Sequence, residues 1–219
     1  MRVLVQVDRP SLKGLAQVLG SLGFSISIVY SIEECIEFAN LFDVNTILLP
    51  FDNQRISGSS LSRLREAQIS NPIIMIADSH DGCAAADMLN GGADDFIAER
   101  DVSCTEIASR IRAIVRRHHG FSQAVIKTGL LSIDLDQGTV RFAQRPVHLT
   151  AMEYTILQYM ALNAGQVVTK SCLLDQLYGD LDAPDLKIVD VFLHRVRNKL
   201  SQVGADAKII ATIRGVGYL

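Results

Sequence analysis

A chain of 219 residues is long enough for two ordinary domains, each with its own buried core. The net charge of −3 excludes a polycation that would attract nucleic acid over its whole surface. The charge is unevenly divided, because residues 1–123 carry 11 basic and 15 acidic side chains whereas residues 124–219 carry 10 and 9. Any affinity for nucleic acid must therefore come from a local cluster of cations.

The first 117 residues alternate short apolar runs with helical patterns. We expect strands at residues 3–7, 25–29, 46–49, 73–77 and 95–98, and helices at residues 11–22, 32–40, 60–67, 82–90 and 103–117. Five strand-helix units in a row predict an α/β domain with a parallel sheet covered by helices on both faces. Residues 118–123 lack either periodicity and carry Gly and Ser, which predicts a linker.

Residues 124–219 have a different pattern, in which short extended runs precede helices. Residues 126–149 predict a small antiparallel sheet. Thr150 is placed to cap a helix that begins at Ala151, with Glu153 at the capping-box position, and Gly165 is expected to end that helix. A second helix is expected at residues 170–178, with Thr169 as its cap.

The four cysteines and the N-terminus exclude several kinds of site. The cysteines are Cys35, Cys83, Cys104 and Cys172. They form no Cys-x-x-Cys motif, and no His lies at metal-ligand spacing, so we expect reduced core thiols, no metal and no cofactor. The apolar strand that follows Met1 and Arg2 leaves no room for a signal peptide, and no apolar run reaches membrane-spanning length. We therefore expect a cytoplasmic protein with no membrane partner.

The most informative segment is the predicted helix at residues 185–200. Its apolar residues lie at i, i+3, i+4, i+7 and i+11, and they are Val189, Phe192, Leu193, Val196 and Leu200. This stripe must pack against a core. The opposite side carries cations suited to phosphates and small apolar groups suited to base edges, namely Lys187, Ile188, Val191, His194 and Arg195, with Arg197 on the flank.

A hairpin follows the helix at residues 212–218, with two glycines in the turn and Arg214 at the tip. The helix, the hairpin and the segments LTAMEY (149–154) and LKIVDVF (186–192) resemble the winged helix-turn-helix of OmpR/PhoB-type response regulators, and most closely their CtrA-like branch. The resemblance covers the whole chain. It implies a flavodoxin-like receiver domain at residues 1–117 and a winged helix-turn-helix domain at residues 124–219.

The resemblance implies that the second domain binds double-stranded promoter DNA. Expected base contacts come from Ile188, Val191 and Arg195, and expected phosphate contacts from Lys187, His194 and Arg197. The wing would contribute Thr212 and a minor-groove arginine, Arg214. Asp190 is expected to make an internal salt bridge or helix contact. Residues 163–170 would be the loop that contacts RNA polymerase, and two domains would bind tandem half-sites about one helical turn apart.

The receiver departs from the family's phosphorylation chemistry. Family members accept a phosphoryl group on an Asp at the end of the third strand and hold Mg²⁺ with an acidic pair. A hydroxyl residue at the end of the fourth strand and a Lys at the end of the fifth bind the phosphoryl oxygens. Of the acidic pair, the sequence keeps only Asp8. Pro50 stands at the position of the acceptor Asp, Ala77 at that of the hydroxyl residue and Glu99 at that of the Lys. We therefore expect no phosphorylation. The alternative is that the third strand is out of register and that Asp52 is the acceptor.

The pairing face of the receiver is better preserved. The family dimerises through its fourth helix, fifth strand and fifth helix, and the matching charged residues are Asp94, Asp95, Glu106, Arg110 and Arg116. Asp87 lies where the family often has a basic residue, so the sequence does not identify the residue that pairs with Glu106. We therefore predict a homodimeric transcription regulator that acts without aspartyl phosphorylation. The two rivals are a regulator switched by phosphorylation of Asp52 and a protein-binding adaptor; an enzyme is not expected.

Overall fold

A computed structural model of the chain describes residues 1–51, 58–79, 82–178 and 184–219. Internal contacts divide it into two compact units, residues 2–115 and residues 116–219. None of the described helices is both long enough and apolar enough to cross a membrane.

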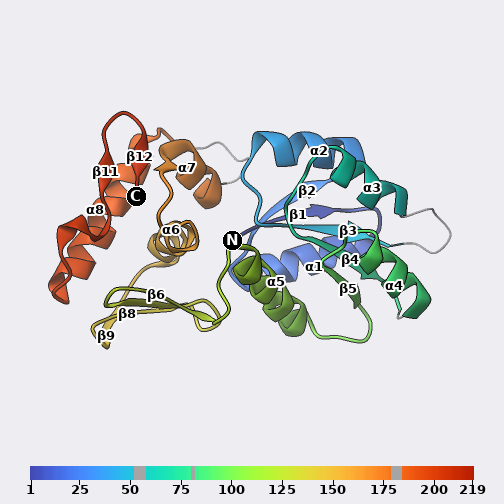
Figure 1. The fold of residues 1–219 in the computed structure, drawn as a ribbon, viewed down its shortest axis with the longest axis horizontal. Helices are drawn as coiled ribbons and strands as arrows, with labels where there is room; N and C mark the ends of the chain where they lie inside the picture. The colour runs from blue at the N-terminus through green and yellow to red at the C-terminus, as the bar shows by residue number, and fades with distance from the viewer. Residues whose placement is uncertain (52–57, 80–81, 179–183) are drawn as a thin grey trace. The chain divides into compact units, whose positions relative to one another are not determined.

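The first unit is a five-stranded parallel sheet with helices on both faces (Figure 1). In chain order its elements are β1 (Arg2–Gln6), α1 (Pro10–Ser21), β2 (Ser25–Val29), α2 (Ile32–Leu41), β3 (Thr46–Pro50), α3 (Gly58–Glu66), β4 (Ile73–Ala77), α4 (Gly82–Asn90), β5 (Asp95–Ala98) and α5 (Cys104–His118). The strand order is β2-β1-β3-β4-β5. The predicted flavodoxin-like order is therefore confirmed, and no element bound differs from the predicted one by more than two residues.

The core of this unit lies against the central strands. On one face Leu4, Ile47 and Met75 pack with α2 and α3, and all three are fully buried. Figure 1 shows α1 and α5 on the other face of the sheet, where both helices bury apolar stripes. Because both faces are covered, the carboxyl ends of the strands form the exposed edge at which receiver chemistry would take place.

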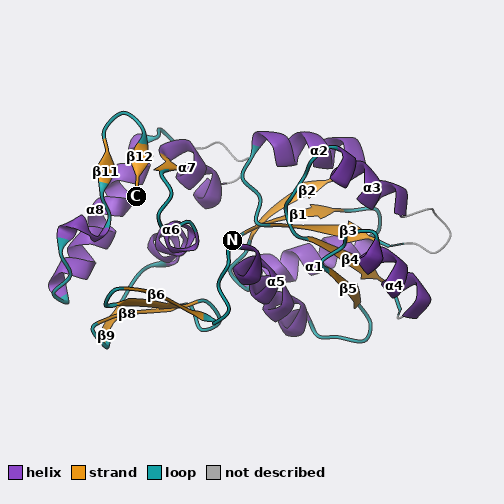
Figure 2. Cartoon of the chain, in the orientation of Figure 1, coloured by secondary structure: helices purple, strands orange, loops and turns teal. Residues whose placement is uncertain are grey.

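The described residues of the second unit form two small sheets, three α-helices and one short 3-10 helix (Figure 2). Its elements are β6 (Val125–Thr128), β7 (Leu131–Asp134), β8 (Thr139–Phe142), β9 (Arg145–Val147), α6 (Ala151–Leu162), β10 (Val168–Thr169), α7 (Lys170–Tyr178), α8 (Lys187–Gln202), the short 3-10 helix η1 (Ala207–Ile209), β11 (Thr212–Ile213) and β12 (Gly217–Tyr218). Strands β6 to β9 form an antiparallel meander, and β10-β12-β11 form the second sheet. The predicted antiparallel sheet and winged helix-turn-helix fold are confirmed.

Local capping explains where the helices of this unit begin. The Thr150 hydroxyl accepts a hydrogen bond from the Glu153 amide, and the Glu153 carboxylate accepts one from the Thr150 amide, so the predicted capping box is confirmed. Thr169 caps α7 by accepting a hydrogen bond from the Cys172 amide at 3.2 Å. Helix α6 ends at Leu162, three residues before the predicted stop at Gly165, which adopts a φ of +87° in the following turn.

Candidate nucleic-acid interface and receiver edge

Helix α8 presents two different faces. Val189, Phe192, Leu193, Val196 and Leu200 are all buried, which confirms the predicted apolar stripe. On the opposite face Lys187, Val191, His194 and Arg195 are exposed, whereas Ile188 and Arg197 are half-buried. The helix therefore offers cations and a small apolar side chain to solvent while its stripe fixes its orientation.

The start of α8 is held by Asp185 rather than by a side chain at the N-cap. The Asp185 carboxylate accepts a hydrogen bond from the Lys187 amide at 2.9 Å, and its carbonyl accepts one from the Ile188 amide at 2.9 Å. Further along the helix, the guanidinium of Arg195 lies 5.9 Å from the ring centroid of Phe192. This cation–π contact holds the guanidinium against the helix, although Arg195 as a whole stays exposed.

Asp190 joins the helix to two other elements. Its carboxylate accepts hydrogen bonds from Lys170 Nζ at 2.8 Å, at the start of α7, and from the hydroxyl of Tyr218 on β12. The hydrogen bond from Lys170, followed by that from Tyr218, lowers the pKa of Asp190. Burial, followed by the bond to Asp190, raises the pKa of Tyr218 to about 12. The predicted internal role of Asp190 is therefore confirmed.

Arg197 holds the wing. Its Nε and Nη2 donate to the carbonyl oxygen of Ile210 at 3.1 and 2.7 Å, and Nη2 also donates to Thr212 Oγ1 at 2.8 Å. The guanidinium lies 5.5 Å from the ring centroid of Tyr218. The helical pattern alone gave only the flank position of Arg197, so these bonds to residues 13 and 15 positions later were not foreseen.

The wing is a tight hairpin between β11 and β12. Gly215 has a φ of +77° in its turn, and the Val216 amide donates to the Ile213 carbonyl at 3.0 Å. The side chain of Arg214 is exposed at the tip, as predicted. A groove of about 400 Å³ separates the wing from the start of α7, and its lining includes Lys170 and Arg214. Two cations therefore border a groove that also reaches Leu186, the N-cap residue of α8.

A partly buried ion pair fixes the far end of α8. Lys199 Nζ lies 2.6 Å from Glu153 Oε2, and the Glu153 side chain is only 3% exposed. Burial by itself would raise the pKa of Glu153, but the hydrogen bonds from Lys199 and Thr150 outweigh it and lower the pKa. The capping box thus also anchors the helix that carries the candidate DNA contacts, a link that sequence periodicity did not reveal.

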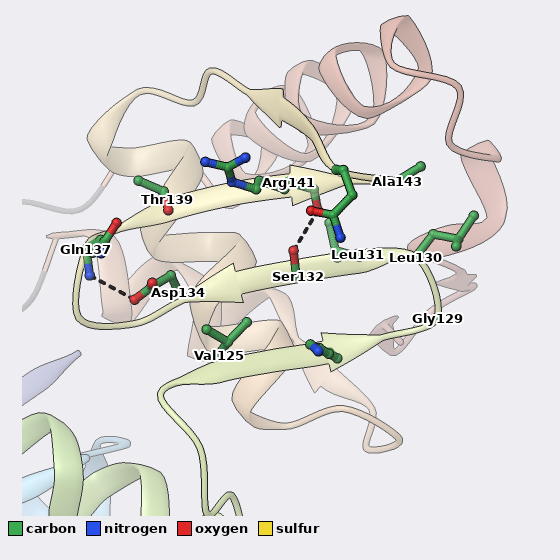
Figure 3. Close-up of a pocket in the computed structure, with 12 residues that line it drawn as sticks. Val125, Gly129, Leu130, Leu131, Ser132, Asp134, Gln137, Thr139, Arg141 and Ala143 are labelled. Atoms are coloured by element: carbon green, nitrogen blue, oxygen red, sulfur yellow. Dashed lines mark hydrogen bonds between the residues drawn. The ribbon is translucent and has the colours of Figure 1, made fainter.

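The four-stranded sheet carries a separate surface hollow (Figure 3). Its volume is about 690 Å³, and its lining comes from β6, β7, β8 and the turns between them. Figure 3 shows Arg141 and Ser132 on this face, whereas Val140 and Phe142, the chain neighbours of Arg141, are buried. Arg141 is therefore an exposed arginine of the same unit that lies outside helix α8 and the wing.

The carboxyl edge of the parallel sheet carries the residues expected from the sequence. Pro50 is the last residue of β3 and pairs with Ile76, so the strand predicted at residues 46–49 is confirmed and extends by one residue. Ala77 ends β4, and the amide of Glu99, just after β5, donates to the Ala77 carbonyl at 2.8 Å. Asp52, the alternative acceptor, lies outside the described residues.

The resemblance implies Mg²⁺ at this edge, but the described residues do not fit a divalent cation. Between Asp8, after β1, and Asp78, after β4, lies the guanidinium of Arg9, with nitrogen-oxygen distances of 3.7 and 3.1 Å. A positive side chain thus already occupies the space beside both carboxylates. Elsewhere in the described residues no group of three or more His, Cys, Asp or Glu side chains could hold a metal ion.

The five residues predicted for dimer pairing fall into separate groups within the chain. Arg110 lies 2.8 Å from Glu106 and 3.3 Å from Asp95. Asp94 instead pairs with Arg65 at 3.1 Å and accepts a hydrogen bond from the Ile73 amide. Arg116 is half-buried near the end of α5. On α4, all of whose residues are described, no side chain is fully buried, and Asp87 is exposed.

Comparison with known proteins agrees with this architecture. Residues 144–219 match the family model described as "Transcriptional regulatory protein, C terminal". The chain is 36% identical over 221 residues to the cell cycle transcriptional regulator CtrA of Caulobacter vibrioides, and 36% identical over 224 residues to the cell cycle response regulator CtrA of Brucella ovis. Both alignments cover 100% of this chain and 95% of the relative.

Among solved structures, the response regulator DrrB of Thermotoga maritima, an OmpR/PhoB homologue, aligns with a TM-score of 0.43 and 23% identity. That alignment covers 100% of this chain and 97% of DrrB. The identity to both CtrA proteins, which extends over the full chain, carries the assignment. The chain therefore belongs to the OmpR/PhoB family of DNA-binding transcriptional response regulators, together with CtrA.

Proposed function

We propose that this protein recognises specific promoter sequences through helix α8 and the wing, as a dimer on tandem half-sites, and that it does so without aspartyl phosphorylation. One observation carries the proposal: the exposed Arg195 and Arg214 belong to two elements that Asp190 and Arg197 join by hydrogen bonds. A helix and a wing held at a fixed geometry can enter neighbouring grooves together.

Different residues would have different tasks at the DNA. Arg195 would fork onto a base edge, with Ile188 and Val191 against apolar base groups. Lys187 and His194 would contact phosphates, and Arg214 would enter the minor groove. These residues lie on the outward side of α8 and at the tip of the wing.

Arg197 and Thr212 would act mainly by positioning the wing. The hydrogen bonds of Arg197 to Ile210 and Thr212 engage Nε and Nη2, so a phosphate contact would be made by a guanidinium that is already anchored. Such a contact would lose little side-chain entropy on binding, because the side chain is ordered beforehand. The loop at residues 163–170 would be available to RNA polymerase, and the site of action would be the cytoplasm.

The receiver would serve as a pairing module. Proline has no side-chain oxygen to attack phosphorus, and Glu99 adds a negative charge where the family neutralises the phosphoryl oxygens. Charged residues on β5 and α5 would guide association of two copies, as a network around an apolar patch rather than as isolated pairs.

Selection of bound fragments from genomic DNA tests this proposal. The full-length, unphosphorylated chain should recover fragments that share tandem half-sites about 10 base pairs apart. Recovery of unrelated sequences, with equal affinity for selected and random duplexes, would contradict sequence-specific recognition.

A further inference from the structure

The side chain of Arg9 ties together the carboxyl ends of two strands. Its Nη2 donates to the carbonyl oxygen of Ile76 on β4 at 2.9 Å, and its Nε lies 3.1 Å from Asp78 Oδ1 and 3.2 Å from Ser11 Oγ. Its Nη1 lies 3.7 Å from Asp8 Oδ1. One guanidinium thus joins the residues after β1, the end of β4 and the first turn of α1.

The carbonyl oxygen of Ile76 also accepts a hydrogen bond from the residue that follows β3. Ile76 O accepts a hydrogen bond from the Phe51 amide at 2.8 Å, directly after β3. Arg9 therefore uses the second lone pair of an oxygen at the junction of β3 and β4. Its side chain is only 19% exposed, compared with 25% for Asp8 and 55% for Asp78, so the cation is the most covered member of the group.

This position conflicts with a bound divalent cation. Mg²⁺ is held in proteins by one or two carboxylates together with waters, and Asp8 and Asp78 both reach a single guanidinium. Without the guanidinium, the two negative charges would lie near each other with no cation between them, an arrangement that favours binding of a divalent cation. With Arg9 present, a metal ion would meet a fixed positive charge within contact distance of both ligands.

We propose that Arg9 is a built-in cation at this edge of the sheet, so that the native protein binds no Mg²⁺ there, and that removing its charge uncovers a divalent-cation site formed by Asp8 and Asp78. The inference deepens the proposed phosphorylation independence, because the metal required for phosphoryl transfer would be excluded by a residue of the chain itself. Its readout is metal binding, which is independent of DNA recognition.

The test compares thermal unfolding of the full-length chain in MgCl₂ and in NaCl of equal ionic strength. We expect no Mg²⁺-specific change in Tm for the native chain or for Arg9→Lys, which keeps the charge. Arg9→Ala should gain a Mg²⁺-specific rise in Tm of roughly 4 °C or more, which grows with the logarithm of the MgCl₂ concentration. Arg9→Gln, which removes the charge but keeps a donor for Ile76 O, serves as a second variant if Arg9→Ala folds poorly.

The double variant Asp8→Asn/Arg9→Ala should lose the gain, because one of the two carboxylates is gone. A folded Arg9→Ala or Arg9→Gln protein with no Mg²⁺-specific rise would overturn the inference. A second experiment needs no variant at residue 9. The native chain is titrated with Mn²⁺, and binding of the ion is measured from the electron paramagnetic resonance signal of free Mn²⁺. Absence of binding supports the inference, and binding that Asp8→Asn abolishes overturns it.

Discussion

Replacing Gly217 with alanine tests how closely the wing must approach the start of α7. A Cβ at residue 217 would lie 2.0 Å from the carbonyl oxygen of Val168, 2.8 Å from its carbonyl carbon and 3.0 Å from the Cα of Thr169. All three are backbone atoms, so no side-chain rotation can relieve the clash. Because carbon-oxygen contacts are normally about 3.3 Å or longer, β10 and β12 would have to separate by more than about 1 Å.

That separation removes the pairing of Val168 with Tyr218 and of Thr169 with Gly217. Overpacking costs about 1–3 kcal/mol, and the loss of one hydrogen bond costs about 1 kcal/mol more. We therefore expect the free energy of unfolding of the second unit to fall by about 2–4 kcal/mol. Tyr218 would also move away from Asp190, so DNA affinity should fall about tenfold or more, equivalent to about 1.4 kcal/mol.

Hydrogen exchange of the full-length chain, with DNA binding measured by fluorescence anisotropy, checks this expectation. Amides of β10 and β12 should lose protection in Gly217→Ala. Gly215→Ala is the matched control, because no atom lies within 4 Å of its Cβ position and only its φ of +77° is strained, at a cost of about 1–2 kcal/mol. Native-like protection and DNA affinity in Gly217→Ala would refute the reasoning.

Three further predictions concern charge and phosphorylation. The ionised carboxylate of Asp190 stabilises the fold at pH values above its ordinary pKa of 3.8, and this stabilisation is lost as the pH falls through the lowered pKa. Acid unfolding followed by circular dichroism should show this loss of stability in the native chain and not in Asp190→Asn. Incubation with acetyl phosphate and Mg²⁺ should add no phosphate mass, because Pro50 offers no nucleophile, and a gain that disappears in Asp52→Asn would favour the rival acceptor. Arg110→Glu, which places like charges beside Asp95 and Glu106, should weaken self-association in sedimentation of the full-length chain at tens of micromolar, whereas an unchanged dimer would mean that pairing uses another face.

The regular elements could be predicted because their signals are local. The apolar stripe of α8 and the capping residue Thr150 lie within a few positions of the backbone that they organise, so periodicity and spacing are sufficient. The strand order followed from resemblance combined with five alternating units. The small shifts in bounds arise at the ends, where the register of the last hydrogen bond is set by tertiary contacts.

The contacts that shape the candidate sites could not be predicted in this way. Arg9 reaches Ile76, Glu153 meets Lys199, and Asp190 meets Tyr218, at separations of 67, 46 and 28 residues. A lone arginine after a strand gives no indication of which distant carbonyl it will satisfy. The need for glycine at residue 217 likewise depends on the backbone of Val168, which only the folded hairpin brings close.

The most direct test of the central claim is the specificity ratio of DNA binding by unphosphorylated protein. Affinities for a selected operator and for a scrambled duplex of equal length should be measured at one salt concentration for the native chain, Arg195→Ala and the control Arg141→Ala. Arg195→Ala should lose about 1–3 kcal/mol on the operator and little on the scrambled duplex, while Arg141→Ala should retain the native ratio. Equal losses of Arg195→Ala on both duplexes would contradict sequence recognition by this helix.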